Sequence, residues 1–165
     1  MNTKIYFAKT NPNAIIPTKR DEDAGYDIYP CFEEEYMRIL PHETVMIPTG
    51  IASACDSDYC FVLKERGSTG TKGIAQRCGI IDSGYRGEWF VPITNTGDTA
   101  IVIEKKDSPR SHIKGIKEIV YPYEKAITQA LVIPVPKSKV YEVTLDKLNE
   151  MGSERGNGAL GSSNK

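Results

Sequence analysis

The apolar positions of this chain fall into short runs rich in valine and isoleucine, separated by Gly, Pro, Asp and Ser. Runs of this length between turn residues predict β-strands. We find no long helical period, and only residues 145–151 leave room for one or two helical turns. Many short strands at regular spacing predict an all-β fold, a jelly-roll-like sandwich or barrel. The strands expected from the pattern lie at residues 43–52, 59–64, 88–95, 100–104, 118–121 and 126–135.

Prolines interrupt three of these runs, at Pro48, Pro92 and Pro134. Proline has no N–H to donate to a neighbouring strand, so inside a sheet it is confined to strand ends, bulges and edges. The pattern therefore indicates such positions and argues against a deeply buried parallel sheet.

A chain of 165 residues is long enough for one domain with its own hydrophobic core. Residues 105–117 are charged, contain Pro109 and Gly115, and predict an extended surface loop. The last fourteen residues are rich in Gly and Ser and have too little apolar surface to fold alone. They are either a frayed terminus or a flap that becomes ordered on an anionic ligand. We expect a β-domain over residues 1–151 and a C-terminal flap over residues 152–165.

The net charge of −1, with basic and acidic residues interspersed, argues against a nucleic-acid partner. The four cysteines form no CxxC pair and have no histidines at zinc spacing, which predicts buried, reduced thiols. The polar N-terminus and the absence of any apolar run of membrane-spanning length indicate no membrane partner. The expectation is a cytoplasmic protein.

The densest motif is Gly-Ile-Ile-Asp-Ser-Gly-Tyr-Arg-Gly-Glu at residues 79–88. A strand that ends at Ile81, a turn at Ser83 and Gly84, and a return through Trp89 predict a β-hairpin with Asp82 at its shoulder. An aspartate before Ser-Gly is also a common turn-initiating residue, so the motif alone leaves a structural and a chemical interpretation open.

Other motifs accompany this one in a fixed order. They are Asp-Ala-Gly-Tyr-Asp-Ile at 23–28, Glu-Arg-Gly-Ser-Thr-Gly-Thr-Lys-Gly at 65–73, Ala-Ile-Thr-Gln-Ala-Leu at 126–131, and Arg-Gly at 155–156. With these five ordered motifs the chain resembles the trimeric dUTPase family, across nearly its whole length. The resemblance implies a homotrimer of jelly-roll type that hydrolyses dUTP to dUMP and pyrophosphate with Mg²⁺.

The resemblance also implies roles for single residues. Asp82 matches the aspartate that activates the water attacking the α-phosphorus. Tyr85 matches the tyrosine that lies against the deoxyribose and leaves no room for a 2′-hydroxyl. Backbone groups around Gly79 and Phe90 match those that contact the uracil edge, and Asp27 matches the aspartate that touches the water shell of the metal. Mg²⁺ dehydrates reluctantly, which fits a sequence without a clustered set of carboxylate ligands.

A further group is implied to surround the phosphates and cover the base. Arginine side chains suit this task because their planar fork binds two phosphate oxygens at once. Three departures from the family pattern stand out: Gly67 and Ser68 replace its Ser-Gly, Ala126 replaces an arginine, and Leu160 replaces a phenylalanine that stacks on the base. The implied contact residues are Arg66, Gly67, Ser68, Gln129, Arg155, Leu160, Gly161, Ser162 and Ser163.

Two alternatives deserve comparison. The dCTP deaminases share the fold and an Ile-Asp-x-Gly segment, but they carry a glutamate base ten residues past the aspartate, where this chain has Pro92. Phage-encoded members of the dUTPase family also act as regulatory partners of repressors, which makes residues 105–117 a candidate protein-binding surface. A merely solvated loop is the simpler interpretation of that segment, and the motifs favour the hydrolase.

Overall fold

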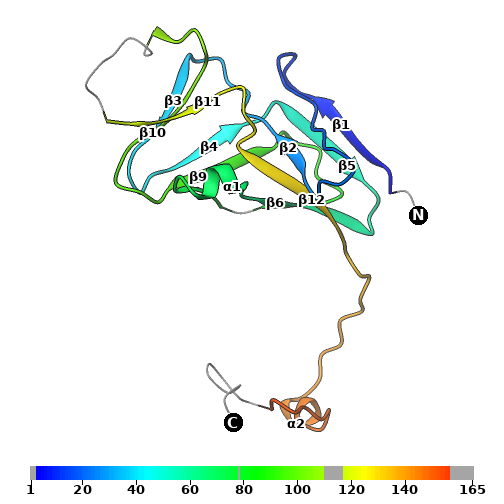
Figure 1. The fold of residues 1–165 in the computed structure, drawn as a ribbon. Coiled ribbons are helices and arrows are strands. Elements are labelled where there is room, and N and C mark those ends of the chain that lie inside the picture. Colours follow the sequence, from blue (N-terminus) through cyan, green and yellow to red (C-terminus); the bar gives the residue numbers. More distant parts are fainter. Residues whose placement is uncertain (1–2, 78, 110–116, 157–165) are drawn as a thin grey trace.

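The computed structural model describes residues 3–77, 79–109 and 117–156. Within these ranges the regular secondary structure is almost entirely β-strand, with two short helices, α1 (Gly67–Gly70) and α2 (Leu145–Asn149) (Figure 1). Neither helix is long and apolar enough to cross a membrane. The strands are β1 (Ile5–Lys9), β2 (Tyr26–Ile28), β3 (Tyr36–Ile39), β4 (Thr44–Pro48), β5 (Ile51–Cys55), β6 (Tyr59–Lys64), β7 (Ile74–Gln76), β8 (Ile80–Ile81), β9 (Phe90–Asn95), β10 (Ile101–Glu104), β11 (Ile119–Pro122) and β12 (Thr128–Pro134).

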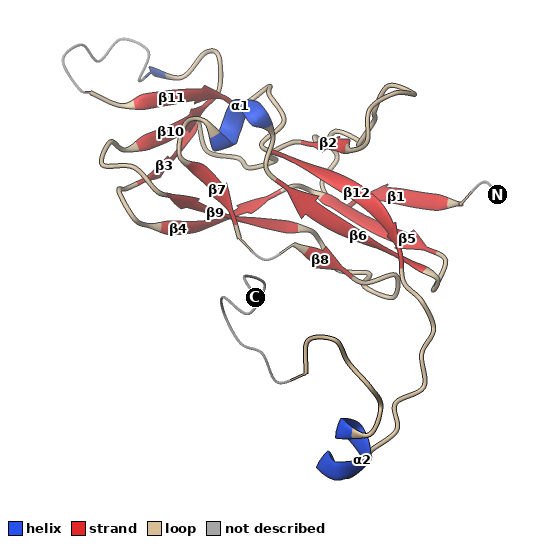
Figure 2. Ribbon diagram, turned by 60° about the horizontal axis from the view of Figure 1, so that its bottom comes forward, coloured by secondary structure: helices blue, strands red, loops and turns tan. Residues whose placement is uncertain are grey.

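The strands form four small sheets, in the orders β1-β5, β11-β10-β3, β2-β12-β6-β8 and β4-β9-β7. Among the described strands only β10 and β11 run parallel; every other pair is antiparallel. Figure 2 shows these sheets gathered into one body, with the C-terminal segment running away from it. The predicted all-β sandwich is confirmed.

The core is built around three aromatic rings. The rings of Phe7, Phe61 and Trp89 have centroids 5.0 to 5.6 Å apart and meet in tilted or edge-on orientations. Such pairs add about 0.5–1.5 kcal/mol each beyond the burial of their area. Branched aliphatic side chains from several strands complete the core, among them Ile28, Ile39, Ile47, Ile51, Ile74, Ile93, Ile101, Ile103 and Ile127.

The expected strand over residues 43–52 is wrong, because a turn divides it into β4 and β5. Gly50 adopts a φ of +65°, and a Cβ there would lie 2.8 Å from the Cβ of Ala14 and 2.9 Å from the Sγ of Cys31. Thr49 fixes the turn by donating from Oγ1 to the carbonyl of Trp89 at 2.7 Å. The apolar run is continuous in sequence, and the left-handed glycine breaks it.

Two of the three prolines lie at strand ends as expected, and the expectation is wrong for Pro92. Pro48 and Pro134 end β4 and β12. Pro92 lies inside β9, the central strand of its sheet, and its carbonyl accepts from the N–H of Arg77 at 2.8 Å. The reciprocal bond from position 92 cannot form, and β7 ends at this point, at Gln76.

The cysteines are only partly as expected. Of the three that the structure describes, Cys31 is buried, whereas Cys55 and Cys60 are half-buried, and all three are free thiols. Burial raises the pKa of the Cys31 and Cys55 thiols, which keeps them protonated and unreactive at neutral pH. Cys78 lies outside the described residues.

The body ends near Val135, whose N–H donates to the carbonyl of Asp58 at 2.7 Å. The described residues beyond it, 136–156, are exposed. Here α2 forms where a short helix was expected, and the Oγ1 of Thr144 caps it by accepting from the N–H of Lys147. The chain thus leaves the body before the predicted domain boundary after Met151, and the flap over 152–165 stays a prediction.

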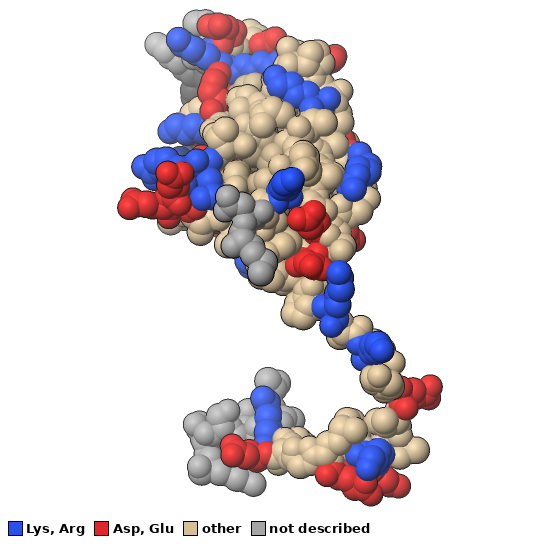
Figure 3. All heavy atoms as spheres, turned by 90° about the vertical axis from the view of Figure 1, so that its right-hand side faces the viewer, with Lys and Arg blue, Asp and Glu red and all other residues tan. Residues whose placement is uncertain are grey.

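Charged side chains of both signs are mixed over the face shown in Figure 3, which carries no broad area of one sign. This distribution agrees with the net charge of −1. Among the described residues, that face offers no basic surface of the kind that binds nucleic acid.

Candidate active site

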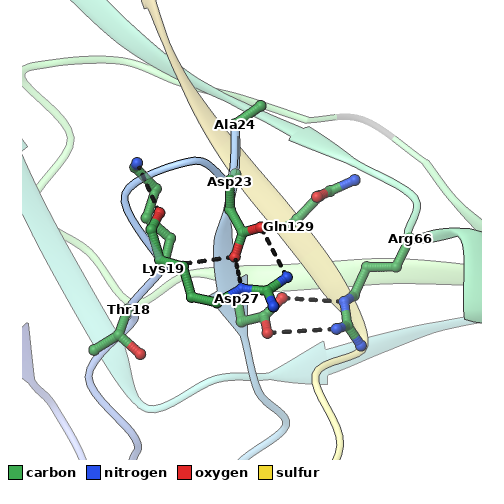
Figure 4. A pocket seen from close by; sticks show the side chains of 9 residues that line it. Thr18, Lys19, Asp23, Ala24, Asp27, Arg66 and Gln129 are labelled. Carbon is green, nitrogen blue, oxygen red and sulfur yellow. Dashed lines mark hydrogen bonds and ion pairs between the residues drawn. The ribbon is translucent and has the colours of Figure 1, made fainter.

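A polar pocket of about 500 Å³ opens beside β2 and β12 (Figure 4). Three of the residues predicted from the motifs, Asp27, Arg66 and Gln129, come together in its wall. They lie far apart in the sequence, and the pairing of β2 with β12 brings Asp27 directly opposite Gln129. The pocket is lined by Thr18, Lys19, Arg20, Asp23, Ala24, Gly25, Asp27, Arg66 and Gln129.

Arg66 is anchored firmly in this wall. Its Nε lies 3.0 Å from Oδ1 of Asp27, and its Nη2 donates to Oδ2 of the same carboxylate at 3.4 Å. Its Nη1 donates to the carbonyl of Ala126 at 3.1 Å. The Arg66 and Asp27 side chains are 30% and 34% exposed, so both keep a face toward the pocket. The pair therefore aligns a cation and a carboxylate side by side.

Gln129 is held by its neighbours. Its Nε2 donates to the carbonyl of Glu65 at 2.9 Å. Gly25 packs directly against it, since a Cβ at position 25 would lie 2.9 Å from the Gln129 Oε1 and 3.0 Å from its Cβ. The glycine of the first motif is therefore required for the position of the glutamine of the fourth.

The one-turn helix α1 starts directly after Arg66. The backbone N–H of Arg66 donates to Oγ1 of Thr69 at 3.1 Å, and this buried threonine fastens the turn. Gly67 and Ser68 are exposed at its first positions. Within the described part of the chain the Ser68 hydroxyl has no hydrogen-bond partner. Ser68 therefore presents a free hydroxyl next to Arg66 in sequence, and its contact with phosphate stays a prediction.

The predicted β-hairpin around Asp82 is wrong. The strand before it, β8, pairs with β6, whereas the strand after it, β9, pairs with β4 and β7 in another sheet. The segment between them crosses from one sheet to the other and includes Trp89, which is fully buried. Asp82 itself is exposed, and its carbonyl accepts from the N–H of Tyr85 at 3.1 Å in a local turn.

Tyr85 is folded back onto this crossing segment. Its hydroxyl donates to the carbonyl of Glu88 at 3.0 Å. A Cβ at Gly87 would lie 2.6 Å from Cζ of the ring, so glycine is required beneath it. Tyr85 is 44% exposed.

The motif analysis missed two residues that brace the segment. Arg86 donates through Nη1 to the carbonyls of Ser83 at 2.7 Å and of Ser53 at 3.2 Å. Glu88 accepts from the N–H of Gly50 at 2.9 Å. Both residues lie inside the densest motif, where charged residues alternate with glycines, and this position is the sequence feature that could have identified them.

Gly79 lies at a second hollow, of about 530 Å³, beside β6. Its φ is +152°, its carbonyl accepts from the N–H of Leu63 at 2.7 Å, and a Cβ there would lie 3.0 Å from the Leu63 carbonyl. Phe90, expected to act with it, does not line this hollow; it begins β9, opposite Pro48, and is 43% exposed. The β7–β9 pairing ends with Gln76 opposite Ile93, and the hydrogen bond from Arg77 to Pro92 continues it toward these two residues.

Asp27 and Asp82, two predicted site residues, are separated within one chain. Asp27 lies in β2 and Asp82 follows β8, and these are the outer strands of the same four-stranded sheet. Three inter-strand steps place them about 14 Å apart across the sheet. Of the tail residues, Arg155 is exposed beyond α2, and Leu160, Gly161, Ser162 and Ser163 lie outside the described residues.

No group of three or more His, Cys, Asp or Glu side chains in the described ranges is arranged to hold a metal ion. Asp27 is the carboxylate predicted to contact the water shell of a metal ion. Each of its two oxygens accepts one contact from Arg66 and retains a lone pair for a water molecule.

Comparison with known proteins agrees with these motifs. Residues 11–108 match the dUTPase family model. The deoxyuridine 5′-triphosphate nucleotidohydrolase of Nautilia profundicola is 30% identical over 166 residues, which span 98% of this chain and 99% of that protein. That of Leptospira interrogans is 35% identical over 105 residues, 61% of this chain and 72% of that protein.

Solved structures show the same fold. A mutant of the dUTPase of Staphylococcus bacteriophage 80alpha, solved with dUpNHpp, has a TM-score of 0.77 at 24% identity, covering 97% of this chain and 98% of that one. The EIAV dUTPase has a TM-score of 0.61 at 23% identity, covering 87% and 98%. With the matched family model and the full-length relative, these findings establish that the chain belongs to the dUTPase family.

Proposed function

We propose that this enzyme of the dUTPase family hydrolyses dUTP to dUMP and pyrophosphate, by attack of water on the α-phosphorus with Asp82 as the base. The observation that carries the proposal is the pocket in which Asp27, Arg66 and Gln129 meet beside the exposed hydroxyl of Ser68. The names of the full-length and partial relatives agree with this reaction.

Asp82 is suited to activate water. Its side chain is exposed, and within the described ranges its carboxylate has no hydrogen-bond partner, so its oxygens are free to accept a proton. The local turn to Tyr85 and the contacts of Arg86 hold its backbone, which limits the reorganisation needed when a substrate is bound.

Tyr85 would supply the selection for deoxyribose. Its hydroxyl is tied to the Glu88 carbonyl and Gly87 supports the ring from below. A ring fixed in this way forms a rigid wall, and an added 2′-hydroxyl would have to displace it. We therefore expect UTP to be a poor substrate.

The phosphates would meet Arg66, Ser68, Gln129 and the backbone of Gly67, which has open space above it. Mg²⁺ fits this site because the ion keeps most of its waters and binds through substrate phosphates, so a single carboxylate, Asp27, suffices to accept from its water shell. The related dUTPase of phage phi11 coordinates a structural Mg(II) ion. The bound ion would neutralise phosphate charge.

We further propose that the site is completed in a homotrimer. A separation of about 14 Å between the strands that carry Asp27 and Asp82 is too large for the pocket around Asp27 and the Asp82 carboxylate to contact one α-phosphate within a chain. In a ring of identical copies, a heterologous contact can set the β8 edge of one copy against the β2 edge of the next. The exposed segment that carries Arg155 would close over the triphosphate.

The test is a substrate panel of dUTP, dCTP, dTTP and UTP with Mg²⁺, in which nucleotide products, pyrophosphate and ammonia are all measured. We expect dUMP and pyrophosphate from dUTP, and little product from UTP or dTTP. Comparable rates on UTP and dUTP would contradict the role of Tyr85. Ammonia from dCTP would favour the deaminase alternative, which Pro92 argues against because it is buried in β9 and has no proton to exchange.

A regulatory protein partner that binds residues 105–117 stays a prediction, since residues 110–116 lie outside the described ranges. The start of the segment is anchored: Lys105 donates through Nζ to the carbonyl of Glu33 at 2.7 Å and lies over the ring of Tyr123. A pull-down with the intact chain and with a chain shortened in this loop tests the prediction.

A further inference from the structure

Three cations line the polar pocket, and two of them are held in place by several contacts with the protein. Arg66 donates from all three of its nitrogens to Asp27 and Ala126. Lys19 donates through Nζ to the carbonyls of Arg20 and Asp21, at 3.2 and 3.4 Å, and lies 5.6 Å from the ring centroid of Tyr26. These side chains are positioned by the fold, which limits how far they can turn toward a bound anion.

Arg20, the third cation, is different. Its side chain is 87% exposed and has one partner among the described residues, Asp23. Nε and Nη2 of Arg20 donate to that carboxylate at 2.9 and 3.0 Å, which leaves both N–H groups of Nη1 and one of Nη2 unused. Asp23 also accepts from the backbone N–H of Arg20 at 3.2 Å, so the carboxylate is fixed by the loop itself.

The nearby carboxylates favour the charged form of Arg20 further. The hydrogen bond and charge of Asp23 raise the pKa of the guanidinium, and the charge of Asp27 across the pocket adds to this. Asp27 is the same carboxylate that binds Arg66. Arg20 lines the same pocket as the Asp27–Arg66 pair, where the phosphates are proposed to bind.

We infer that Arg20 is a further phosphate-binding residue of this pocket, which exchanges the carboxylate of Asp23 for the triphosphate when the nucleotide enters. The inference rests on the proposed function. An exposed ion pair is worth little, since water solvates both partners well, so releasing Asp23 costs little. A guanidinium bound in bidentate fashion to a multiply charged phosphate gains more than it gives up.

In this exchange Asp23 competes with the triphosphate for the guanidinium of Arg20. In the free pocket it satisfies Arg20, and once displaced it remains beside the phosphates as an unpaired negative charge. Its side chain is 38% exposed and can be hydrated there. Asp23 thus weakens binding of the triphosphate and favours the return of Arg20 after the pyrophosphate has left.

The test compares the affinities of the intact chain and of Arg20→Ala for two probes, dUpNHpp and dUMP, by titration calorimetry. We expect the loss of one bidentate contact to weaken dUpNHpp binding about tenfold, and to leave dUMP within about twofold. Arg20→Lys should recover part of the loss. Lys137→Ala is the matched control, because Lys137 is also exposed and paired with an aspartate, Asp58, but does not line the pocket.

The variant Asp23→Asn provides a second, independent test of the exchange. Its amide oxygen can still accept from the backbone N–H of Arg20, while the negative charge is lost. We expect dUpNHpp to bind several-fold more tightly, with a smaller gain when Arg20 is also alanine. Equal dUpNHpp affinity in the intact chain and in Arg20→Ala would overturn the inference alone. An intact chain that neither binds dUpNHpp nor hydrolyses dUTP would overturn the proposed function, and this inference with it.

Discussion

The guanidinium of Arg66 holds the carboxylate of Asp27 by two contacts, of 3.0 and 3.4 Å, while its third nitrogen reaches the Ala126 carbonyl. One side chain thereby joins β2, the start of α1 and the segment that leads into β12. The alignment of the pocket depends on this planar fork, because each of its three nitrogens has a different acceptor.

Arg66→Lys should therefore damage the enzyme although the charge is conserved. An ammonium group cannot make the three directed contacts, so Asp27 and Ala126 lose their common partner. We expect kcat/KM for dUTP to fall about 10–100-fold, a typical effect of misplaced binding groups. Arg77→Lys is the control, since Arg77 is exposed and donates to Thr94 outside the pocket. Equal losses in the two variants would contradict a specific role for Arg66.

Asp82→Asn should remove the base and keep the shape of the loop. A positioned general base contributes about 10²–10⁴-fold, so we expect kcat to fall by this factor while dUpNHpp binds nearly as well as before. Asp56→Asn changes an exposed aspartate in the turn between β5 and β6 and should have no effect. If Asp82→Asn keeps most of its activity, Asp82 is only a turn residue.

Mixing two inactive variants tests whether the site is shared between copies. Arg66→Ala and Asp82→Asn chains are denatured together in equal amounts and refolded, and the trimer is confirmed by light scattering. A site works only where an intact Asp82 meets an intact Arg66 from the next copy, so random mixing should restore about a quarter of the wild-type activity. Each variant refolded alone is the control. Mixed trimers without activity would place the whole site within one chain.

Truncation after Met151 should separate folding from catalysis. The described residues that it removes, 152–156, are exposed, so we expect the melting temperature to change by less than about 2 °C. Loss of Arg155 and the rest of the flap should lower kcat/KM by about 10² or more, the scale of a lost charge-stabilising group. Arg155→Ala in the full chain should reproduce much of this loss. A fully active truncated chain would show that the tail has no catalytic part.

Gly50→Ala should destabilise the fold. The φ of +65° and the 2.8 Å approach to Ala14 together predict a loss of about 2–4 kcal/mol in the free energy of unfolding. Gly97→Ala is the matched control, because its added Cβ would meet only Asn95 Oδ1, at 3.6 Å, and we expect a change within about 0.5 kcal/mol. Urea denaturation at equal protein concentration measures both. Similar values for the two variants would contradict the strain at Gly50.

The sequence predicted the strands that carry continuous branched apolar residues, such as β10 and β12, because their burial is visible in the residues themselves. It did not predict β2, in which Tyr26, Asp27 and Ile28 form a strand only because β12 pairs with them. The hairpin after Ile81 failed for the same reason. The partner of β8 is chosen by the long-range pairing with β6, and the local turn has no part in that choice.

The sequence predicted some residues of the candidate site and missed others. Motif resemblance assembled Asp27, Arg66 and Gln129, which the structure brings into one pocket. Arg20 and Arg86 were missed, because an arginine next to turn residues has the same local pattern whether it faces solvent, braces a loop or lines a pocket. A cytoplasmic location likewise stays a prediction.

The segment between Val135 and the cap of α2 acts as a tether of defined length. Its ten residues, 135–144, span at most about 35 Å, since an extended chain advances no more than about 3.6 Å per residue. A group held by so short a tether has an effective concentration in the millimolar range, roughly independent of how dilute the enzyme is. We therefore expect Arg155, which follows α2, to need only weak binding to a phosphate and to return to it quickly after each turnover. A free peptide carrying the same residues would have to be supplied at about millimolar concentration to replace it.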